Sequence, residues 1–207
     1  MNTSEMGGRQ APMACLPPCT SITKDDVLNG SASAADVRAF HRQCLSGVTI
    51  ITTMVGGTPR GMALNAFASV SLEPPVVLAC IAKTSATYRP LISSGHFALN
   101  LLAADQSEVV ARFARSGGAE KFDGLAWRAG RFGAPLIEGS CAHLEAVVES
   151  RVDAYTHTVL FGRVLAASSS SALSPIGYLA GKVFDPRDPA QWDTIMTSFL
   201  SRPAEAS

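Results

Sequence analysis

The stretch from Arg60 to Thr87 reads RGMALNAFASVSLEPPVVLACIAKTSAT. Its apolar run at 76–82 follows Pro74 and Pro75 and is short and continuous, which predicts a buried strand. Small hydroxyl and amide side chains lie on both sides of that strand: Asn65, Ser69, Ser71, Ser85 and Thr87. This mixture suits a flat heterocycle, because apolar neighbours cover its faces while N–H groups and hydroxyls meet its edge and any phosphate. The hydroxyls could instead satisfy nearby backbone groups, and composition alone favours that simpler interpretation.

Further strands are predicted on both sides of this stretch. The segment 48–54 is almost entirely β-branched, and the turn residues GGTP at 56–59 separate it from 60–64, so the two form a hairpin. Other strands are expected at 97–102, 142–148, 155–167 and 176–184. The segment 119–139 holds several glycines and a proline and is expected to be irregular.

Four helices are predicted between and after the strands. They run from 33 to a stop at Gly47, over 88–93, from 105 to a stop at Gly117 and Gly118, and from 188 to 200. Two of them open on capping boxes, SAAD and DQSE, in which the first and fourth residues satisfy each other's free backbone N–H groups. The last begins with Asp188 and Pro189, and proline suits a first helical turn.

The order of these elements predicts the fold class. Strands do not alternate regularly with helices, which argues against a doubly wound parallel sheet. A closed antiparallel barrel with helices packed at its ends and side is the best match. We expect a tail over 1–32, a single barrel domain over 33–186, and a C-terminal helix and tail over 187–207.

Composition excludes several functional classes. The chain has 207 residues, a formal net charge of zero, 16% charged residues and 47% hydrophobic residues. It is too apolar to be disordered as a whole and lacks the positive excess that nucleic-acid binding requires. The shortage of charge predicts a partly covered surface, most simply covered by a second copy in a homodimer.

The sequence predicts a cytoplasmic protein that is not bound to a membrane. Its longest apolar stretch, 74–82, is too short to span a bilayer, and the N-terminus lacks the apolar segment of a signal peptide. The five cysteines are therefore expected to be thiols. Cys15 and Cys19 read as incidental tail thiols, and Cys44, Cys80 and Cys141 as small packed hydrophobes.

Common catalytic motifs are missing. The turn GGTPRG at 56–61 is not the dinucleotide fingerprint G-x-G-x-x-G and lies between strands. The sequence has no Walker loop and no G-x-S-x-G elbow. Its four histidines are scattered, so we expect no metal site.

Residues 61–75, GMALNAFASVSLEPP, resemble the signature G-M-T-x-N-[AS]-F-x-S-V-S-x-x-P-P of the flavin reductase-like family. Further segments resemble family motifs in the same order: GVTI at 47–50, KTSAT at 83–87, SGHFALN at 94–100, KFDG at 121–124, APL at 134–136 and THT at 156–158. The resemblance covers roughly 36–184 and implies an antiparallel, Greek-key FMN-binding split β-barrel.

The resemblance also implies a function. The family's members are small reductase components that transfer a hydride from NADH or NADPH to FMN or FAD and supply reduced flavin to a partner monooxygenase. This chemistry needs no strong general base, because the cofactors carry it. The alternative is a flavin- or haem-binding split-barrel module without turnover, since a fold does not fix a function.

Matching the motifs residue by residue implies a flavin site. The residues implied to bind the cofactor are Ala63, Asn65, Ala66, Ser69, Val70, Ser71, Cys80, Ala82, Ser85, Thr87, Lys121 and Tyr178. Ser85, Thr87 and Lys121 are implied to face the phosphate. His157 matches the family's histidine near the flavin and nicotinamide, and is the implied catalytic residue; it could also be an ordinary packed histidine. The chain departs from the family at Ala63, usually Thr, and at Tyr155 and Thr156, usually Gly-Asp.

Overall fold

The computed structural model describes residues 32–200, with side chains described through Thr197. The chain divides into two compact units between Ala39 and Phe40, within helix α2 (Ala34–Arg42). Every strand and every other helix of the described part belongs to the unit that begins at Phe40. The predicted N-terminal tail, with Cys15 and Cys19, lies outside the described residues.

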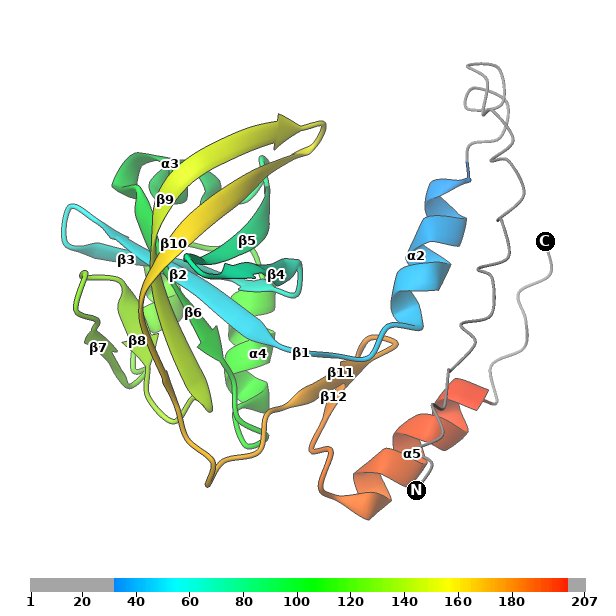
Figure 1. Cartoon of the computed structure of the whole chain (residues 1–207). Coiled ribbons are helices and arrows are strands. Elements are labelled where there is room, and N and C mark those ends of the chain that lie inside the picture. The colour runs from blue at the N-terminus through cyan, green and yellow to red at the C-terminus, as the bar shows by residue number, and fades with distance from the viewer. Residues whose placement is uncertain (1–31, 201–207) are drawn as a thin grey trace, which may run out of the picture. The chain divides into compact units, whose positions relative to one another are not determined.

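Seven antiparallel strands form the main sheet, and Figure 1 shows them curling into an incomplete barrel. In spatial order they are β3 (Thr58–Leu64), β2 (Thr49–Val55), β6 (His96–Leu101), β9 (Ala142–Ala154), β10 (His157–Ser169), β5 (Pro75–Ala82) and β4 (Phe67–Leu72). The two outer strands, β3 and β4, do not pair with each other. The split barrel is therefore confirmed, and the expectation of a closed barrel is wrong.

Helices rather than a strand pack on β3. Helix α4 (Ser107–Ala114) and the 3₁₀ turn η1 (Ala119–Phe122) contact it at Gly61. A Cβ atom there would lie 2.9 Å from the Phe113 ring and 3.2 Å from the Phe122 ring. This close approach requires glycine, and packing by helices is one way to manage an unpaired edge.

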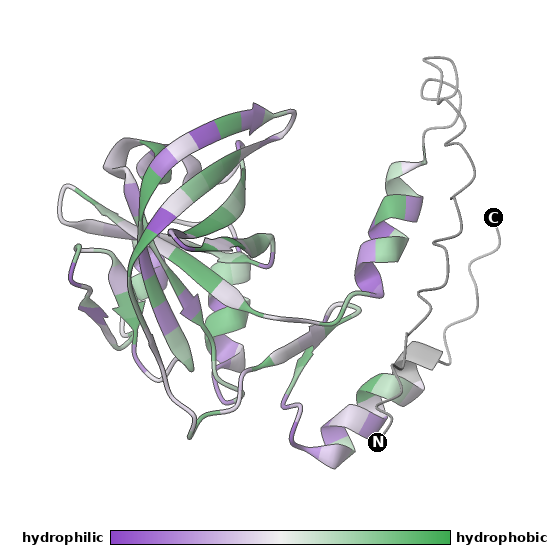
Figure 2. Cartoon of the chain, viewed as in Figure 1, coloured by the Kyte–Doolittle hydropathy of each residue, from purple (hydrophilic) through white to green (hydrophobic). Residues whose placement is uncertain are grey.

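The two larger apolar clusters of the described residues lie in the barrel unit. Ile51, Ile81, Phe97 and Leu160 belong to the first, which helix α3 (Tyr88–Ser94) closes with Leu91. The second joins Ile50 of β2 to Phe113 of α4 and Phe122 of η1. Alternating bands of hydropathy along β9 and β10 reflect the two faces of these long strands (Figure 2).

A small ribbon, β7 (Trp127–Ala129) with β8 (Pro135–Ile137), occupies the segment expected to be irregular. Buried polar side chains hold it on the sheet. The Asn100 amide accepts from Ile137 N at 2.8 Å and donates to Ile50 O at 3.0 Å. The Glu145 carboxylate accepts from Arg131 N at 3.1 Å and Phe132 N at 2.9 Å.

A second small sheet orders β1 (Ser46–Gly47), β11 (Gly177–Leu179) and β12 (Lys182–Phe184), so the single strand expected over 176–184 is wrong. Helix α5 (Pro189–Leu200) packs on β12 through Phe184 and Trp192, whose ring centroids lie 5.2 Å apart. Its cap is as predicted, because Asp188 Oδ1 accepts from Ala190 N at 3.0 Å.

The two predicted capping boxes have different outcomes. The first is confirmed, since Ser33 N donates to Asp36 Oδ2 at 3.0 Å and Asp36 N to Ser33 Oγ at 3.1 Å. The second does not form: the residue before α4 is Gln106, whose Oε1 instead accepts from Ala103 N at 3.0 Å. Helix α2 ends at Arg42, short of Gly47, because Ser46 and Gly47 are drawn into β1. Cys44 beyond it is exposed, contrary to expectation.

The strand expected over 155–167 begins two residues later. Tyr155 and Thr156 form the turn of a long hairpin, and His157 is the first residue of β10, paired with Ala154 of β9. Both strands of this hairpin have 13 residues. The predicted catalytic histidine therefore lies at the tip of a hairpin and is exposed.

Candidate active site

Three of the predicted flavin residues surround one hollow. It has a volume of about 290 Å³ and is lined by Val48, Ala63, Leu64, Asn65, Val110, Ala114 and Tyr178. The wall is mostly aliphatic, and the Asn65 amide and the Tyr178 ring supply its polar and aromatic parts. Sequence reasoning missed Val110 and Ala114, although their i, i+4 spacing on a predicted helix places them on one face.

Asn65 ties the end of β3 to the small sheet. With its amide oriented to satisfy both polar atoms, the oxygen accepts from Ser46 Oγ at 3.3 Å. The nitrogen then donates to the carbonyls of Gly47 and Leu64, also at 3.3 Å. Ser46 pairs with Tyr178 across β1 and β11, so these contacts fix Asn65 relative to Tyr178.

The predicted residues of β4 lie on a free edge. Ser69 and Val70 are exposed, and Ser71 is half-buried. A register shift against β5 between Ser69 and Ser71 leaves Val70 in a bulge. Edge strands present unpaired backbone groups, and bulges redirect side chains there. At the start of this edge the Ala66 carbonyl accepts from Cys80 N at 2.9 Å.

Cys80, Ala82 and His157 share one face of the sheet. Burial alternates along β5, with Val77, Ala79 and Ile81 in the core and Cys80 and Ala82 on the opposite side. His157 pairs directly with Ala82, and Val159 with Cys80. The sequence-predicted strand beneath the flavin thus runs beside the predicted catalytic histidine.

The loop 83–87 connects β3 to the tip of the long hairpin. Lys83 N donates to Thr156 O at 3.0 Å. On the other side, Ser85 Oγ donates to Met62 Sδ at 3.1 Å and Thr87 Oγ1 donates to Gly61 O at 3.0 Å. Residues predicted from separate motifs, on β3, on this loop and at the hairpin tip, are therefore held next to one another.

The residues predicted to face a phosphate already have partners inside the protein. Thr87 is 1% exposed and its hydroxyl is used on Gly61, while Ser85 Oγ also accepts from Thr87 N at 3.1 Å. Lys121 is 6% exposed, with Nζ 3.5 Å from Phe113 O and 5.8 Å from the Phe113 ring centroid. Burial holds the pKa of Lys121 below its usual value, and the nearby charge of Glu120 offsets only part of this effect. Their contact with a phosphate remains a prediction.

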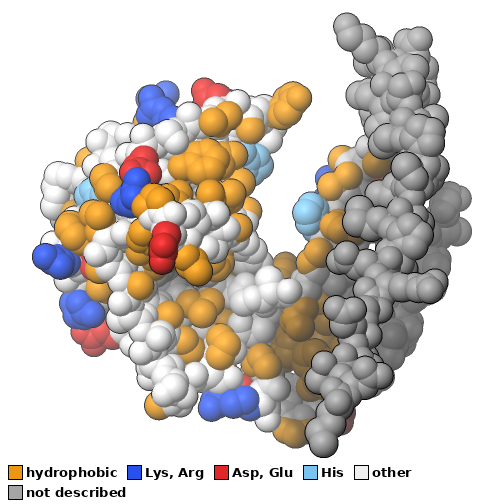
Figure 3. Space-filling view, in the orientation of Figure 1, with side chains coloured by type: hydrophobic (Ala, Val, Ile, Leu, Met, Phe, Trp, Pro, Cys, Tyr) orange, Lys and Arg blue, Asp and Glu red, His pale blue; other side chains and the backbone are white. Residues whose placement is uncertain are grey.

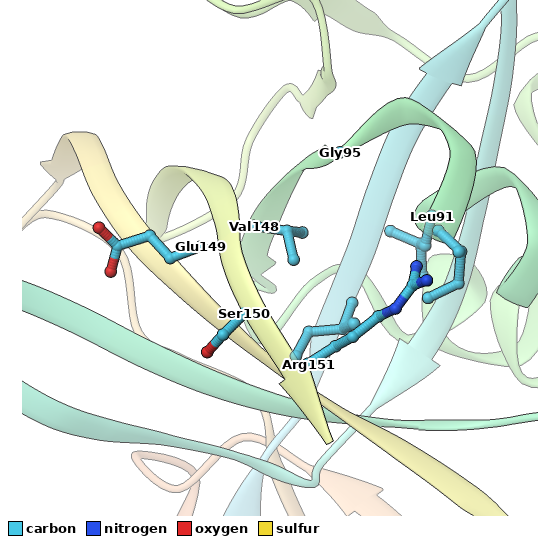
Figure 4. Close-up of a pocket in the computed structure, with 8 residues that line it drawn as sticks. Leu91, Gly95, Val148, Glu149, Ser150 and Arg151 are labelled. Carbon is cyan, nitrogen blue, oxygen red and sulfur yellow. The ribbon is translucent and has the colours of Figure 1, made fainter. Parts of the chain in front are cut away.

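Two other hollows hold none of the predicted residues. One of about 260 Å³ lies between α3 and β9; in Figure 4 the Arg151 side chain extends toward Leu91, while Glu149 points away. Another, of about 350 Å³, is lined by Phe67, three leucines, two alanines and four polar residues. The candidate site is therefore identified by the convergence of the predicted residues rather than by hollow size.

A seven-stranded antiparallel barrel whose outer strands do not pair defines a split-barrel protein. The chain belongs to the flavin reductase-like family, because the profile of the flavin reductase like domain matches residues 41–186. The predicted family and fold are thereby confirmed.

Three similar proteins place the chain among reductases. It is 38% identical over 193 residues, 90% of this chain and 97% of the relative, to the reductase subunit HsaB of a flavin-dependent monooxygenase from Rhodococcus jostii. It is 42% identical over 123 residues, 59% of this chain and 70% of the relative, to the FMN reductase (NADH) SmoA of Agrobacterium fabrum. The solved NADH:FAD oxidoreductase SgcE6 of Streptomyces globisporus superposes with a TM-score of 0.70 at 31% identity, covering 83% of this chain and all of that one.

Proposed function

We propose that this chain transfers a hydride from NADH or NADPH to FMN or FAD at the open side of the split barrel, and passes the reduced flavin to a flavin-dependent monooxygenase. The observation that carries the site is the loop 83–87, which is hydrogen-bonded to β3 on one side and to Thr156 on the other. The family and the names of the relatives support the activity and the partner.

The residues present fit a flavin. Ala63, Ala66 and Ala82 have side chains small enough to let a flat ring approach the strands. The hollow beside Ala63 is aliphatic, and Asn65 with the backbone of the β4 edge supplies polar groups for a ring edge. A bound flavin supplies the hydride acceptor.

The protein's part in the reaction is to orient the two cofactors. Hydride transfer requires donor and acceptor atoms about 3–3.5 Å apart, with no proton abstracted by a side chain. Thr156 Oγ1 lies 2.9 Å from His157 Nδ1, which leaves Nε2 available to a ligand. We assign His157 to holding the nicotinamide by this nitrogen and by packing. Thr87 supports the site by fastening the loop to β3.

We also propose that the chain works as a cytoplasmic homodimer. Large apolar side chains are exposed along β4, among them Leu72 at 82% and Val70 at 48%. Figure 3 shows hydrophobic side chains gathered on this side of the barrel unit. A second copy would cover them. Among the described residues no helix is long and apolar enough to cross a bilayer.

The test is NADH or NADPH oxidation by the purified chain with FMN or FAD, followed at the nicotinamide absorbance. We expect consumption that depends on flavin, and its absence with both nucleotides would favour a binding module without turnover. His157→Ala should slow turnover by about tenfold or more while flavin binding changes little, as for a removed positioning contact. His41→Ala, at an exposed position on α2, is the matched control.

A further inference from the structure

The turn of the long hairpin carries an aromatic side chain that the rest of the protein does not use. Tyr155 is 99% exposed, and its ring makes no contact with another ring or polar group in the described part of the chain. Its backbone φ is +51°, in the left-handed region. A large side chain is disfavoured there, and glycine would adopt the same backbone without that cost.

The turn itself is held firmly. Thr156 O accepts from Lys83 N at 3.0 Å, and Ala154 pairs with His157. Just below, Tyr88 OH donates to Thr158 Oγ1 at 3.0 Å, and Thr158 Oγ1 donates to Asp153 Oδ1 at 2.7 Å. Tyr155 is thus an exposed aromatic ring on a backbone that hydrogen bonds hold in place.

The position of Tyr155 relates it to the nucleotide. It precedes the proposed nicotinamide-holding His157 by two residues, a distance of roughly 6 Å along the chain. The nicotinamide ring must lie against the flavin for hydride transfer, which leaves the adenine ring of the same nucleotide to be placed. The sequence offers no dinucleotide fingerprint to hold that half of the molecule.

We propose that Tyr155 is the stacking platform for the adenine ring of NADH or NADPH. This inference rests on the proposed function. Every purine has an aromatic face that a tyrosine ring can cover, and such stacking tolerates variation in the rest of the ligand. An exposed platform also suits a nucleotide that must leave after each turnover.

Two hydride donors test the proposal. NADH carries the adenine ring and reduced nicotinamide mononucleotide lacks it. Tyr155→Ala should raise the KM for NADH about tenfold, the size expected for one lost base–aromatic stack. Its kcat, its KM for flavin and its use of the mononucleotide should not change. Tyr155→Phe, which keeps the aromatic face, should behave as the native chain does.

A binding measurement without turnover accompanies the kinetics. ADP-ribose, titrated into the full chain by calorimetry, should bind about tenfold more weakly to Tyr155→Ala and to Tyr155→Gly, and unchanged to Tyr155→Phe. The glycine variant relieves the backbone, so a weaker signal from it cannot be due to misfolding.

Three results would overturn the proposal. An equal loss with NADH and with the mononucleotide would place Tyr155 on the nicotinamide side. Unchanged constants for both donors would leave it without a role in binding. A Tyr155→Ala chain whose sedimentation changes from that of the native chain would make the ring an interface residue. If the native chain itself does not oxidise NADH, the proposed function fails, and the ADP-ribose titration still decides whether Tyr155 binds the adenosine half.

Discussion

Two hairpin turns of the barrel unit have the same length and different contents. Gly56 and Gly57 connect β2 to β3, with Val55 paired to Thr58. Tyr155 and Thr156 connect β9 to β10 with the same separation between paired strands. The first turn has φ values of +55° and +74° on its glycines, and the second has +51° on a tyrosine.

The two turns differ in whether the backbone requirement of a hairpin alone explains their residues. A two-residue connection between twisted strands calls for positive φ, and glycine provides it at the lowest cost. The β2–β3 turn follows that rule and carries no side chain. The β9–β10 turn has one residue at positive φ in place of two, and that residue is a tyrosine two positions before His157, which the family motif implies to be catalytic. At Tyr155 the chain has a tyrosine where glycine would adopt the same φ at a lower cost in free energy.

The largest effect is expected from breaking the support beneath the Tyr155 turn. Thr158→Val removes a fully buried hydroxyl, so that Tyr88 OH loses its partner and Asp153 Oδ1 loses a donor, while Asp153 Oδ2 still lies 3.8 Å from Lys83 Nζ. We expect a loss of about 1–3 kcal/mol in the free energy of unfolding, measured with urea. Thr156→Val, at an exposed hydroxyl, should cost no more than about 0.5 kcal/mol. Equal losses would show that the network does not support the hairpin.

The glycine turn gives an intermediate effect. At Gly57, with φ of +74°, an added Cβ would meet nothing within 4 Å, so a substitution there measures backbone strain alone. Gly57→Val should lower the unfolding free energy by about 1–2 kcal/mol. Gly57→Asn should cost less, because asparagine tolerates the left-handed region. A valine variant as stable as the native chain would contradict the strain argument for both turns.

The smallest effect, and the one of opposite sign, is expected at the tyrosine turn. Tyr155→Gly removes the strain without losing a contact, since the side chain is 99% exposed. After the greater chain entropy of glycine in the unfolded state is counted, we expect a gain of about 0.5–1 kcal/mol by thermal unfolding. Gly56→Tyr is the reciprocal control and should destabilise the chain. A destabilised Tyr155→Gly would mean that the ring has a packing partner.

The contrast between the turns also shows why the sequence predicts one hairpin turn and not the other. The β2–β3 hairpin was predictable because Gly-Gly interrupts two β-branched runs. The segment Ala-Tyr-Thr-His has no such signal, so its turn was predicted as strand. Strand β4 was not predicted, although polar and apolar residues alternate over 69–72, because these serines were interpreted as polar groups around the neighbouring strand.

The sequence motifs propose the residues of the candidate site and do not predict the contacts of their side chains. The ordered motifs predict Ala63, Asn65 and His157 as site residues. The partners of Thr87 and Lys121, which are the carbonyls of Gly61 and Phe113, depend on how β3, α4 and η1 pack together. That packing is a tertiary property that no local pattern encodes, so only the structure shows these polar groups turned inward.

The tight contact at Gly61 determines how firmly β3 is held at the open side of the barrel. With the Phe113 and Phe122 rings against its backbone, β3 cannot swing outward without disrupting an apolar cluster. The opposite wall, β4, is hydrogen-bonded to β5 alone and is interrupted by its bulge. The two outer strands are therefore held unequally: β3 is fixed by apolar packing, whereas β4 is held by one neighbouring strand. Within one chain, displacement of β4 would therefore break fewer contacts than displacement of β3.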